Sequence, residues 1–229
     1  MPLTAMILAA GRGERMRPLT DHTPKPLFQA GGKPLIVWQI EKLAKAGFSR
    51  IVINHAHLGD QIEQALGNGS VLDVSIAYSV EAPAALETAG GIAKALPLLG
   101  DAPFAVVNGD VFCEFDYNRL KQVIASMPET DLAYLVLVDN PGHNPAGDFS
   151  LEDQRLNETG PRYTFSGIGV YRPELFADVP VGQPAKLAPL LRTAIASGQV
   201  GGEHSTAYWL DVGTPQRLEQ LDQHLREHV

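Results

Sequence analysis

The sequence is poor in cysteine, in long apolar runs and in basic residues. Cys113 is the single cysteine among 229 residues, which excludes a disulfide framework and a cysteine-rich zinc site. No apolar run is long enough to span a membrane, so we expect no membrane partner. The first residues already have a strand pattern rather than that of a signal peptide, and we therefore expect a cytoplasmic protein.

Basic residues are outnumbered by acidic ones, 18 to 26, which gives a formal net charge of −8. A surface that binds the phosphate backbone of nucleic acid needs a basic face, so no nucleic-acid partner is expected. The arginines and the lysine near the N-terminus therefore indicate a local anion site in an acidic protein. No linker or internal repeat divides the chain, and without an added assembly domain the sequence favours a monomer.

The first half of the sequence alternates strand-like and helix-like segments. We expect strands at 5–9, 50–54, 74–79, 104–108 and 132–138, and helices at 35–46, 59–66, 87–99 and 116–126. Such alternation implies right-handed crossovers, so the expected fold is α/β, with a Rossmann-like, mixed and mainly parallel sheet flanked by helices.

The second half changes character after residue 138. It predicts antiparallel strands at 149–151 and 163–171, a polar loop at 152–160 between them, and helices at 185–197 and 215–226. In open parallel sheets, ligands bind at the carboxyl ends of the strands. The turns that follow the strands at 5–9 and 104–108 leave such ends, and we expect them to face one crevice.

A glycine-rich turn after the first strand is the strongest local signal. Ala10, Gly11 and Gly13 allow close approach of backbone N–H groups to an anion, and Arg15 and Lys25 add full positive charges. The dinucleotide-binding fingerprint is excluded because Met16 stands where its third glycine is needed. A P-loop is excluded as well, since Pro34 follows the Gly-Lys pair at 32–33 in place of serine or threonine.

Carboxylates and small residues mark three further segments. Asn108-Gly109-Asp110 follows an apolar strand, and its aspartate is either a magnesium ligand or part of a common turn. Trp209-Leu210-Asp211 precedes Thr214-Pro215, a pair that favours a helix start with threonine as the N-cap. Thr88 and Gly90 lie at the start of the helix expected at 87–99, where we expect free N–H groups.

Together these segments resemble the sugar-1-phosphate nucleotidyltransferases. The family pattern L-A-[AG]-G-x-G-x-R-[LM]-x-P-L-T, followed by P-K-P-[LM], matches residues 8–20 and 24–27, and W-x-D-[VI]-G-T-P matches 209–215. The resemblance implies the nucleotide-diphospho-sugar transferase fold in one domain, with a nucleotide-binding half at 1–130 and a sugar-binding half at 131–229. It also implies that Mg²⁺ is the cofactor.

The resemblance also assigns roles to residues of this sequence. It implies that Asp110 and Asp211 bind Mg²⁺, that Arg15 holds the departing pyrophosphate and that Lys25 neutralises the transferred phosphorus. The implied nucleotide contacts are Ala10, Gly11, Gly13, Arg15, Lys25, Thr88, Gly90, Asn108 and Gly109. The implied sugar contacts are Asn144, Gly147, Asp148 and Gly167. Lys186 and Arg192 are candidates for contacts with the sugar phosphate, but we expect them to be solvated helix residues.

The implied partners are a nucleoside triphosphate and a sugar 1-phosphate. The short chain and the segments at 86–91 and 163–171 are most similar to uridylyltransferases that use UTP and N-acetylmuramate 1-phosphate in peptidoglycan recycling. The alternatives are a guanylyltransferase for mannose or heptose 1-phosphate and a non-catalytic regulator that binds nucleotide sugars. A nicotinamide-dependent oxidoreductase is disfavoured by Met16.

Overall fold

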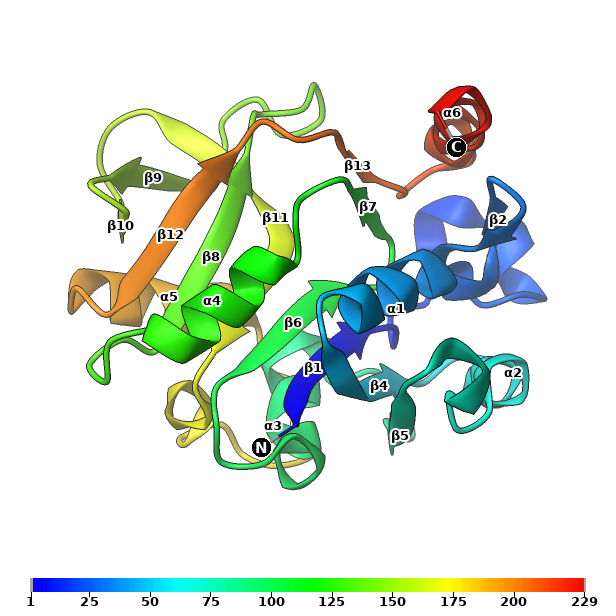
Figure 1. Cartoon of the computed structure of the whole chain (residues 1–229), viewed down its shortest axis with the longest axis horizontal. Helices are drawn as coiled ribbons and strands as arrows, with labels where there is room; N and C mark the ends of the chain where they lie inside the picture. Colours follow the sequence, from blue (N-terminus) through cyan, green and yellow to red (C-terminus); the bar gives the residue numbers. More distant parts are fainter. Residues whose placement is uncertain (1, 229) are drawn as a thin grey trace.

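The computed structural model describes residues 2–228 and contains one large sheet of nine strands (Figure 1). These strands are β1 (Leu3–Leu8), β4 (Phe48–His55), β5 (Ser75–Val80), β6 (Phe104–Asn108), β8 (Ala133–Val138), β9 (Phe149–Glu152), β10 (Arg155–Asn157), β11 (Arg162–Tyr171) and β12 (Val200–Ser205). Two short ladders lie outside it and pair β2 (Gln29–Ala30) with β3 (Lys33–Pro34) and β7 (Val111–Cys113) with β13 (Trp209–Asp211).

The helices agree with the sequence expectation to within two residues at each end. They are α1 (Leu35–Lys45), α2 (Gly59–Leu66), α3 (Glu87–Leu99), α4 (Asn118–Ser126), α5 (Leu187–Ala196) and α6 (Pro215–His228). Short 3-10 turns include η1 (Glu14–Met16) and η3 (Lys25–Leu27) in the segment that follows β1. Within residues 2–228, no helix combines the length and the apolar character needed to cross a membrane.

The parallel part of the large sheet has the order β5-β4-β1-β6. From β1 the chain moves outward to β4 and then β5, and it returns to place β6 on the other side of β1. The order of the strands therefore reverses at β1 and β6, and ligands of open α/β sheets bind in the crevice at such a reversal. The glycine-rich turn follows β1 and the Asn-Gly-Asp turn follows β6, so both are at this crevice.

The second half adds mostly antiparallel pairs, beginning with β11, which pairs with both β6 and β8. Strand β9 pairs with β10 and also with β11, so strands β11-β8-β12-β10-β9 close on themselves, and we call them the small barrel. The prediction of a loop at 152–160 was wrong in part, because this segment contains β10. Leu156 is buried there, and this tertiary contact outweighs the polar composition of the segment.

The sheet separates two apolar layers, because successive strand residues point to opposite faces. Ala5 and Ile7 face the layer that includes residues of α1, α2 and α4, whereas Met6 faces the layer that includes residues of α3 and α5. In Figure 1, α1 and α4 lie in front of the sheet and α3 lies behind it. The sequence expectation of a sheet covered on both faces is confirmed.

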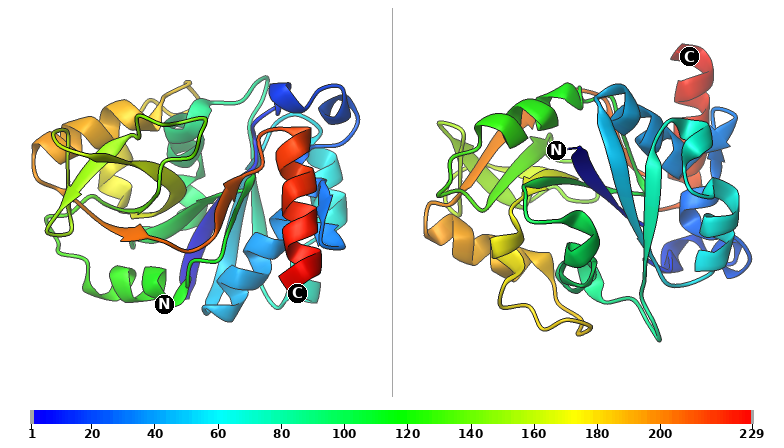
Figure 2. Two further views of the ribbon diagram at one scale, coloured as in Figure 1. Left: turned by 90° about the horizontal axis from the view of Figure 1, so that it is seen from above. Right: turned by 60° about the horizontal axis from the view of Figure 1, so that its bottom comes forward.

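Helix α6 lies apart from the large sheet and packs against the β2–β3 hairpin (Figures 1 and 2). Its Leu221 and Leu225 belong to a third apolar cluster, together with Trp38 and Phe112. The helix begins at Pro215, as expected, and the Thr214 hydroxyl accepts a hydrogen bond from the Arg217 N–H at 3.4 Å. This bond is the N-cap contact that the sequence predicts.

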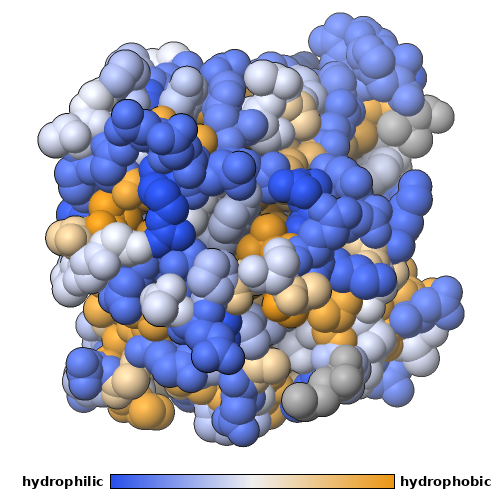
Figure 3. Space-filling view, turned by 60° about the vertical axis from the view of Figure 1, so that its left-hand side comes forward, coloured by the Kyte–Doolittle hydropathy of each residue, from blue (hydrophilic) through white to orange (hydrophobic). Residues whose placement is uncertain are grey.

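The side of the molecule shown in Figure 3 is mainly hydrophilic. Apolar residues appear there as separate patches between polar ones, and such scattered patches are normal on a folded surface.

Candidate active site

The turns after β1 and β6 are joined by a backbone hydrogen bond. The Gly109 N–H donates to the Leu8 carbonyl at 2.9 Å. A Cβ atom at residue 109 would lie 2.8 Å from the same carbonyl oxygen, so this approach requires glycine. The two turns line one cavity, which confirms the expectation that they share a crevice.

The central cavity has a volume of about 370 Å³ and lies at the carboxyl ends of β1, β4 and β6. Its lining includes Gly11, Lys25 and Asp110, and these three residues also line a neighbouring cavity of about 240 Å³. We call this neighbour the loop cavity, because Gly13 and Arg15 of the glycine-rich turn form part of its wall. The shared residues make the two cavities one connected region.

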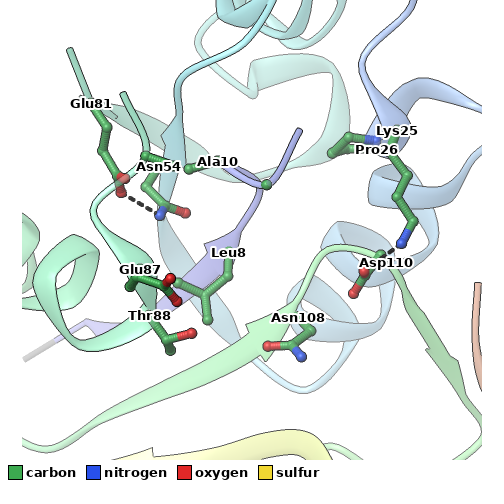
Figure 4. Close-up of a pocket in the computed structure, with 12 residues that line it drawn as sticks. Leu8, Ala10, Lys25, Pro26, Asn54, Glu81, Glu87, Thr88, Asn108 and Asp110 are labelled. Atoms are coloured by element: carbon green, nitrogen blue, oxygen red, sulfur yellow. Dashed lines mark hydrogen bonds and ion pairs between the residues drawn. The ribbon is translucent and has the colours of Figure 1, made fainter. Parts of the chain in front are cut away.

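Lys25 and Asp110 form a close ion pair where the two cavities meet. The lysine Nζ donates to Asp110 Oδ2 at 2.5 Å, and Lys25 is 7% exposed. The lysine is held in place by η3, where it stands between Pro24 and Pro26. Figure 4 shows the lysine side chain extending toward the aspartate on the same side of the cavity.

Asp211 is brought next to Asp110 by the short β7–β13 ladder. The Val212 N–H donates to the Asp110 carbonyl at 2.8 Å, so the two acidic residues are neighbours in the backbone. Arg217 of α6 donates to Asp211 Oδ2 at 2.7 Å and to its carbonyl oxygen at 2.9 Å. Arg15 approaches the same carboxylate at 4.0 Å.

A histidine side chain also lies near this carboxylate. The His143 Nε2 atom is 3.5 Å from Asp211 Oδ2, and its ring stacks near that of Trp209 with 6.5 Å between centroids. Asp211 Oδ2 is therefore surrounded by basic side chains from the N-terminal turn, from the segment before β9 and from α6.

The donor atoms fit a hard cation such as Mg²⁺, which takes oxygen ligands and usually combines one or two carboxylates with substrate phosphates. Within residues 2–228, no hydrogen bond reaches Asp110 Oδ1 or Asp211 Oδ1, so each carboxylate keeps one oxygen for a ligand. The same residues contain no group of three or more His, Cys, Asp or Glu side chains arranged for a metal. A cation here would therefore need phosphate oxygens or water to complete its ligand shell.

A buried polar network forms the opposite wall of the central cavity (Figure 4). Asn54 Oδ1 accepts from the Ala9 N–H at 2.9 Å, and Asn54 Nδ2 donates to Glu81 Oε1 at 2.6 Å. Glu81 Oε2 accepts from the Leu86 N–H at 2.6 Å. Both side chains are 3% exposed, and together they tie the ends of β1, β4 and β5 to the start of α3.

The barrel cavity, of about 330 Å³, opens beside the central cavity. The two cavities share Leu8, Glu87, Thr88 and Asn108. The remaining wall combines apolar side chains with charged ones, and it comprises Val106, Asp148, Phe149, Phe165, Gly167, Tyr171, Lys186, Leu187, Ala188, Leu191 and Arg192. A ligand long enough to pass Asn108 can therefore occupy both cavities.

Residues 4–228 match the nucleotidyl transferase family. The chain belongs to this family. It is 57% identical, over 95% of its length and 96% of the relative, to the N-acetylmuramate alpha-1-phosphate uridylyltransferase of Neisseria meningitidis. It is 35% identical to the Caulobacter vibrioides protein of the same name, over 99% of this chain and 98% of that protein.

Solved structures show the same fold for this nucleotidyl transferase. A Bacillus anthracis protein described as a glucose-1-phosphate thymidylyltransferase, solved with sucrose, superposes with a TM-score of 0.87 at 21% identity and covers 99% of this chain and 96% of its own. HddC of Yersinia pseudotuberculosis, solved with GMP-PN, gives a TM-score of 0.79 at 22% identity, with 97% and 99% covered. The expected nucleotide-diphospho-sugar transferase fold is confirmed.

The structure gathers most of the expected nucleotide-contact residues at the central and loop cavities of this nucleotidyl transferase. Those that line one or both are Ala10, Gly11, Gly13, Arg15, Lys25, Thr88 and Asn108, and the expected metal ligand Asp110 lines both. Gly109 lies behind them against Leu8. The expectation of free N–H groups at the start of α3 was wrong for Ala89 and Gly90, because the Ala185 carbonyl accepts their N–H groups at 2.9 and 3.1 Å. Gly90 thus packs against residues 183–185.

The expected sugar contacts divide into two groups. Asp148 and Gly167 line the barrel cavity. Asn144 lies behind Asp148 and donates to its Oδ2 at 3.2 Å, and Gly147 packs against Arg162. Lys186 and Arg192 also line this cavity, which favours the alternative of a substrate contact over that of solvated helix residues.

Several residues of the site were missed by the sequence analysis of this nucleotidyl transferase. Glu81 follows β5, whose carboxyl end lies at the same edge as those of β1, β4 and β6, and this position was an available signal. Arg217 and His143 carried no local signal, because only the folded chain brings them to Asp211. Burial raises the pKa of the Cys113 thiol, which disfavours the reactive thiolate.

Proposed function

We propose that this protein transfers the uridylyl group of UTP to N-acetylmuramate 1-phosphate, giving the UDP-sugar and pyrophosphate for peptidoglycan recycling. The observation that carries the proposal is the 57% identity, over nearly the full length of both chains, to the Neisseria meningitidis N-acetylmuramate alpha-1-phosphate uridylyltransferase. The proposal places the nucleotide in the half at 1–130 and most sugar contacts in the half at 131–229.

The proposed chemistry is an in-line displacement at phosphorus. A phosphate oxygen of the sugar 1-phosphate attacks the α-phosphorus, the bond to the bridging oxygen of pyrophosphate breaks, and that oxygen leaves with the bonding pair. The nucleophile is already anionic, so no general base is required. Positioning and charge stabilisation are then the main tasks of the protein.

The chain supplies these functions from residues in and beside the central and loop cavities. Lys25 lines both cavities and is the proposed partner of the transferred phosphorus, and Arg15 is the proposed partner of the departing pyrophosphate. Asp110 and Asp211 are the proposed ligands of Mg²⁺, each through the oxygen that has no hydrogen bond within residues 2–228. When bound, Mg²⁺ would supply positive charge to the phosphates of both substrates.

The barrel cavity is the proposed place of the sugar. Lys186 and Arg192 give its wall two cations, and Phe149 and Phe165 give it apolar surface. N-Acetylmuramate carries a carboxylate on its ether substituent and a methyl group on its acetamide, so its charge and its apolar groups both find complementary side chains here. Arg192 already forms an ion pair with Glu158, so a neutral sugar would leave Lys186 as the cation that gains no anionic partner from the substrate.

The test is release of pyrophosphate with each of the four common triphosphates against a panel of sugar 1-phosphates. We expect the highest kcat/KM with UTP and N-acetylmuramate 1-phosphate in the presence of Mg²⁺. The runner-up pair is GTP with mannose 1-phosphate, because a mannose-1-phosphate guanyltransferase of Aspergillus fumigatus is 31% identical over 93% of this chain, which spans 61% of that protein. Preference for the runner-up pair, or no release with any pair, would overturn the proposal.

The expected monomeric state and cytoplasmic location stay predictions. Sedimentation velocity and cell fractionation test them.

A further inference from the structure

Both carboxylates of the proposed metal site already have a cation of the chain bound to them. Lys25 Nζ lies 2.5 Å from Asp110 Oδ2, and Arg217 lies 2.7 Å from Asp211 Oδ2. A metal ion that approaches these carboxylates therefore meets positive charge. Repulsion between like charges at short range disfavours adding the ion unless one resident cation moves away.

The two resident cations differ in how firmly they are held. Arg217 also donates to the Asp211 carbonyl at 2.9 Å, and its own N–H bonds to Thr214 at the start of α6. Within residues 2–228, the hydrogen bonds of Lys25 Nζ end at Asp110 alone. Arg217 is therefore fixed to the backbone, whereas the lysine ammonium is free to exchange one anion for another.

Burial determines when that exchange is favourable. The Lys25 side chain is 8% exposed, so separation from Asp110 without a replacement leaves a buried charge unpaired. Glu14 lines the loop cavity, and Glu81 and Glu87 line the central cavity, but in Figure 4 both of the latter lie across the cavity from the lysine. Phosphate oxygens placed beside Gly11 would supply a replacement anion within the cavity that Lys25 lines.

We propose that Lys25 is an exchange group that couples metal binding to nucleotide binding. In the substrate-free protein it neutralises Asp110, and when triphosphate arrives it transfers its hydrogen bonds to phosphate and frees Asp110 for the metal. This inference rests on the proposed function, and it adds that metal and nucleotide compete with one internal ion pair. Coupling between two ligands is reciprocal, so each should lower the cost of binding the other.

The first experiment measures Mn²⁺ binding to the nucleotide-free protein by electron paramagnetic resonance of the free ion. Lys25→Met should bind Mn²⁺ roughly tenfold more tightly than the original protein, because a charged hydrogen bond no longer has to be broken. Lys25→Arg keeps the cation and should bind Mn²⁺ weakly. Lys33→Met is the matched control, because it removes a lysine–carboxylate pair with Glu41 at 2.7 Å outside the cavities.

The second experiment measures UTP binding by calorimetry in EDTA. Asp110→Asn should raise the affinity for metal-free UTP several-fold, since the lysine is then free to meet phosphate. The same substitution made in the Lys25→Met protein should change that affinity much less. This double-mutant cycle separates a specific exchange from general loss of negative charge.

Two outcomes would overturn the inference: folded Lys25→Met protein that binds Mn²⁺ no more tightly than the original, or equal effects of Asp110→Asn in both backgrounds. These results would leave the proposed function intact if the original protein still bound UTP and released pyrophosphate. Absence of UTP binding by the original protein would instead count against the proposed function.

Discussion

The central cavity and the barrel cavity are neighbours, yet they are built in different ways. The central cavity is formed by short segments that follow parallel strands, and each segment carries several of its polar groups close together in sequence. The barrel cavity is lined by residues of β6, β9, β11 and α5, and these elements are far apart in the sequence. Motifs therefore revealed the first cavity, and only part of the second.

The largest expected effect is on catalysis in the central cavity. Asp110→Asn removes a carboxylate charge with little change of shape, and we expect kcat to fall about 10²–10³-fold, as for loss of a preorganised charge partner. Steady-state pyrophosphate release measures this. Asp101→Asn, at an exposed position before β6, is the control, and full activity of the Asp110 variant would contradict the assigned role.

Stability should distinguish the polar networks of the two cavities. Asn54→Ala leaves Glu81 and the Ala9 N–H with unpaired buried polar groups, so the free energy of unfolding should fall by about 2 kcal/mol or more. Asn144→Ala removes two bonds of 3.2 Å at a partly exposed site and should cost about 1 kcal/mol or less. Urea denaturation measures the free energy of unfolding of both variants. Equal losses of stability would show that the hydrogen bonds of the central cavity do not contribute more than those beside the barrel cavity.

Substrate choice should respond to the barrel cavity. Lys186→Gln should lower kcat/KM for N-acetylmuramate 1-phosphate roughly tenfold, as for loss of one charged contact, and leave N-acetylglucosamine 1-phosphate little changed. Lys121→Gln, an exposed lysine of α4, is the control. A uniform decrease for both sugars would place the lysine at the phosphate and not at the sugar carboxylate.

The smallest expected effect is on thermal stability, at a residue outside both cavities. Asp222 of α6 accepts hydrogen bonds from the Gly31 N–H and from Arg226. The Gly31 bond, followed by the Arg226 bond, holds the pKa of Asp222 below its ordinary value of 3.8. A depressed carboxyl pKa stabilises the fold above that value, and the contribution is lost as the pH falls through the folded-state pKa.

Asp222→Asn should therefore lower the Tm slightly at neutral pH, and the difference from the original protein should shrink below pH 3.8. Thermal unfolding followed from pH 7 into acid measures it, and a difference that does not vary with pH would exclude this carboxylate as its source.

Much of the fold was predictable because periodic patterns report local structure. Helix α1 ends before Gly47, whose φ is 92°, and α6 begins at the predicted Thr214 cap. Strand β12 was missed because Gly201 and Gly202 are poor strand formers. A Cβ atom at residue 202 would lie 2.7 Å from the Leu135 carbonyl oxygen of β8, so the glycine is required by a backbone neighbour that the sequence does not identify.

The sequence by itself determined the glycine-rich turn, the acidic turn after β6 and the helices that flank them, because each depends on interactions between near neighbours in the chain. Only the tertiary structure decided which cation meets which carboxylate. The ladder of β7 and β13 sets Asp211 beside Asp110, and α6 then adds Arg217. Pairing and burial energies depend on distant partners, and no local pattern records them.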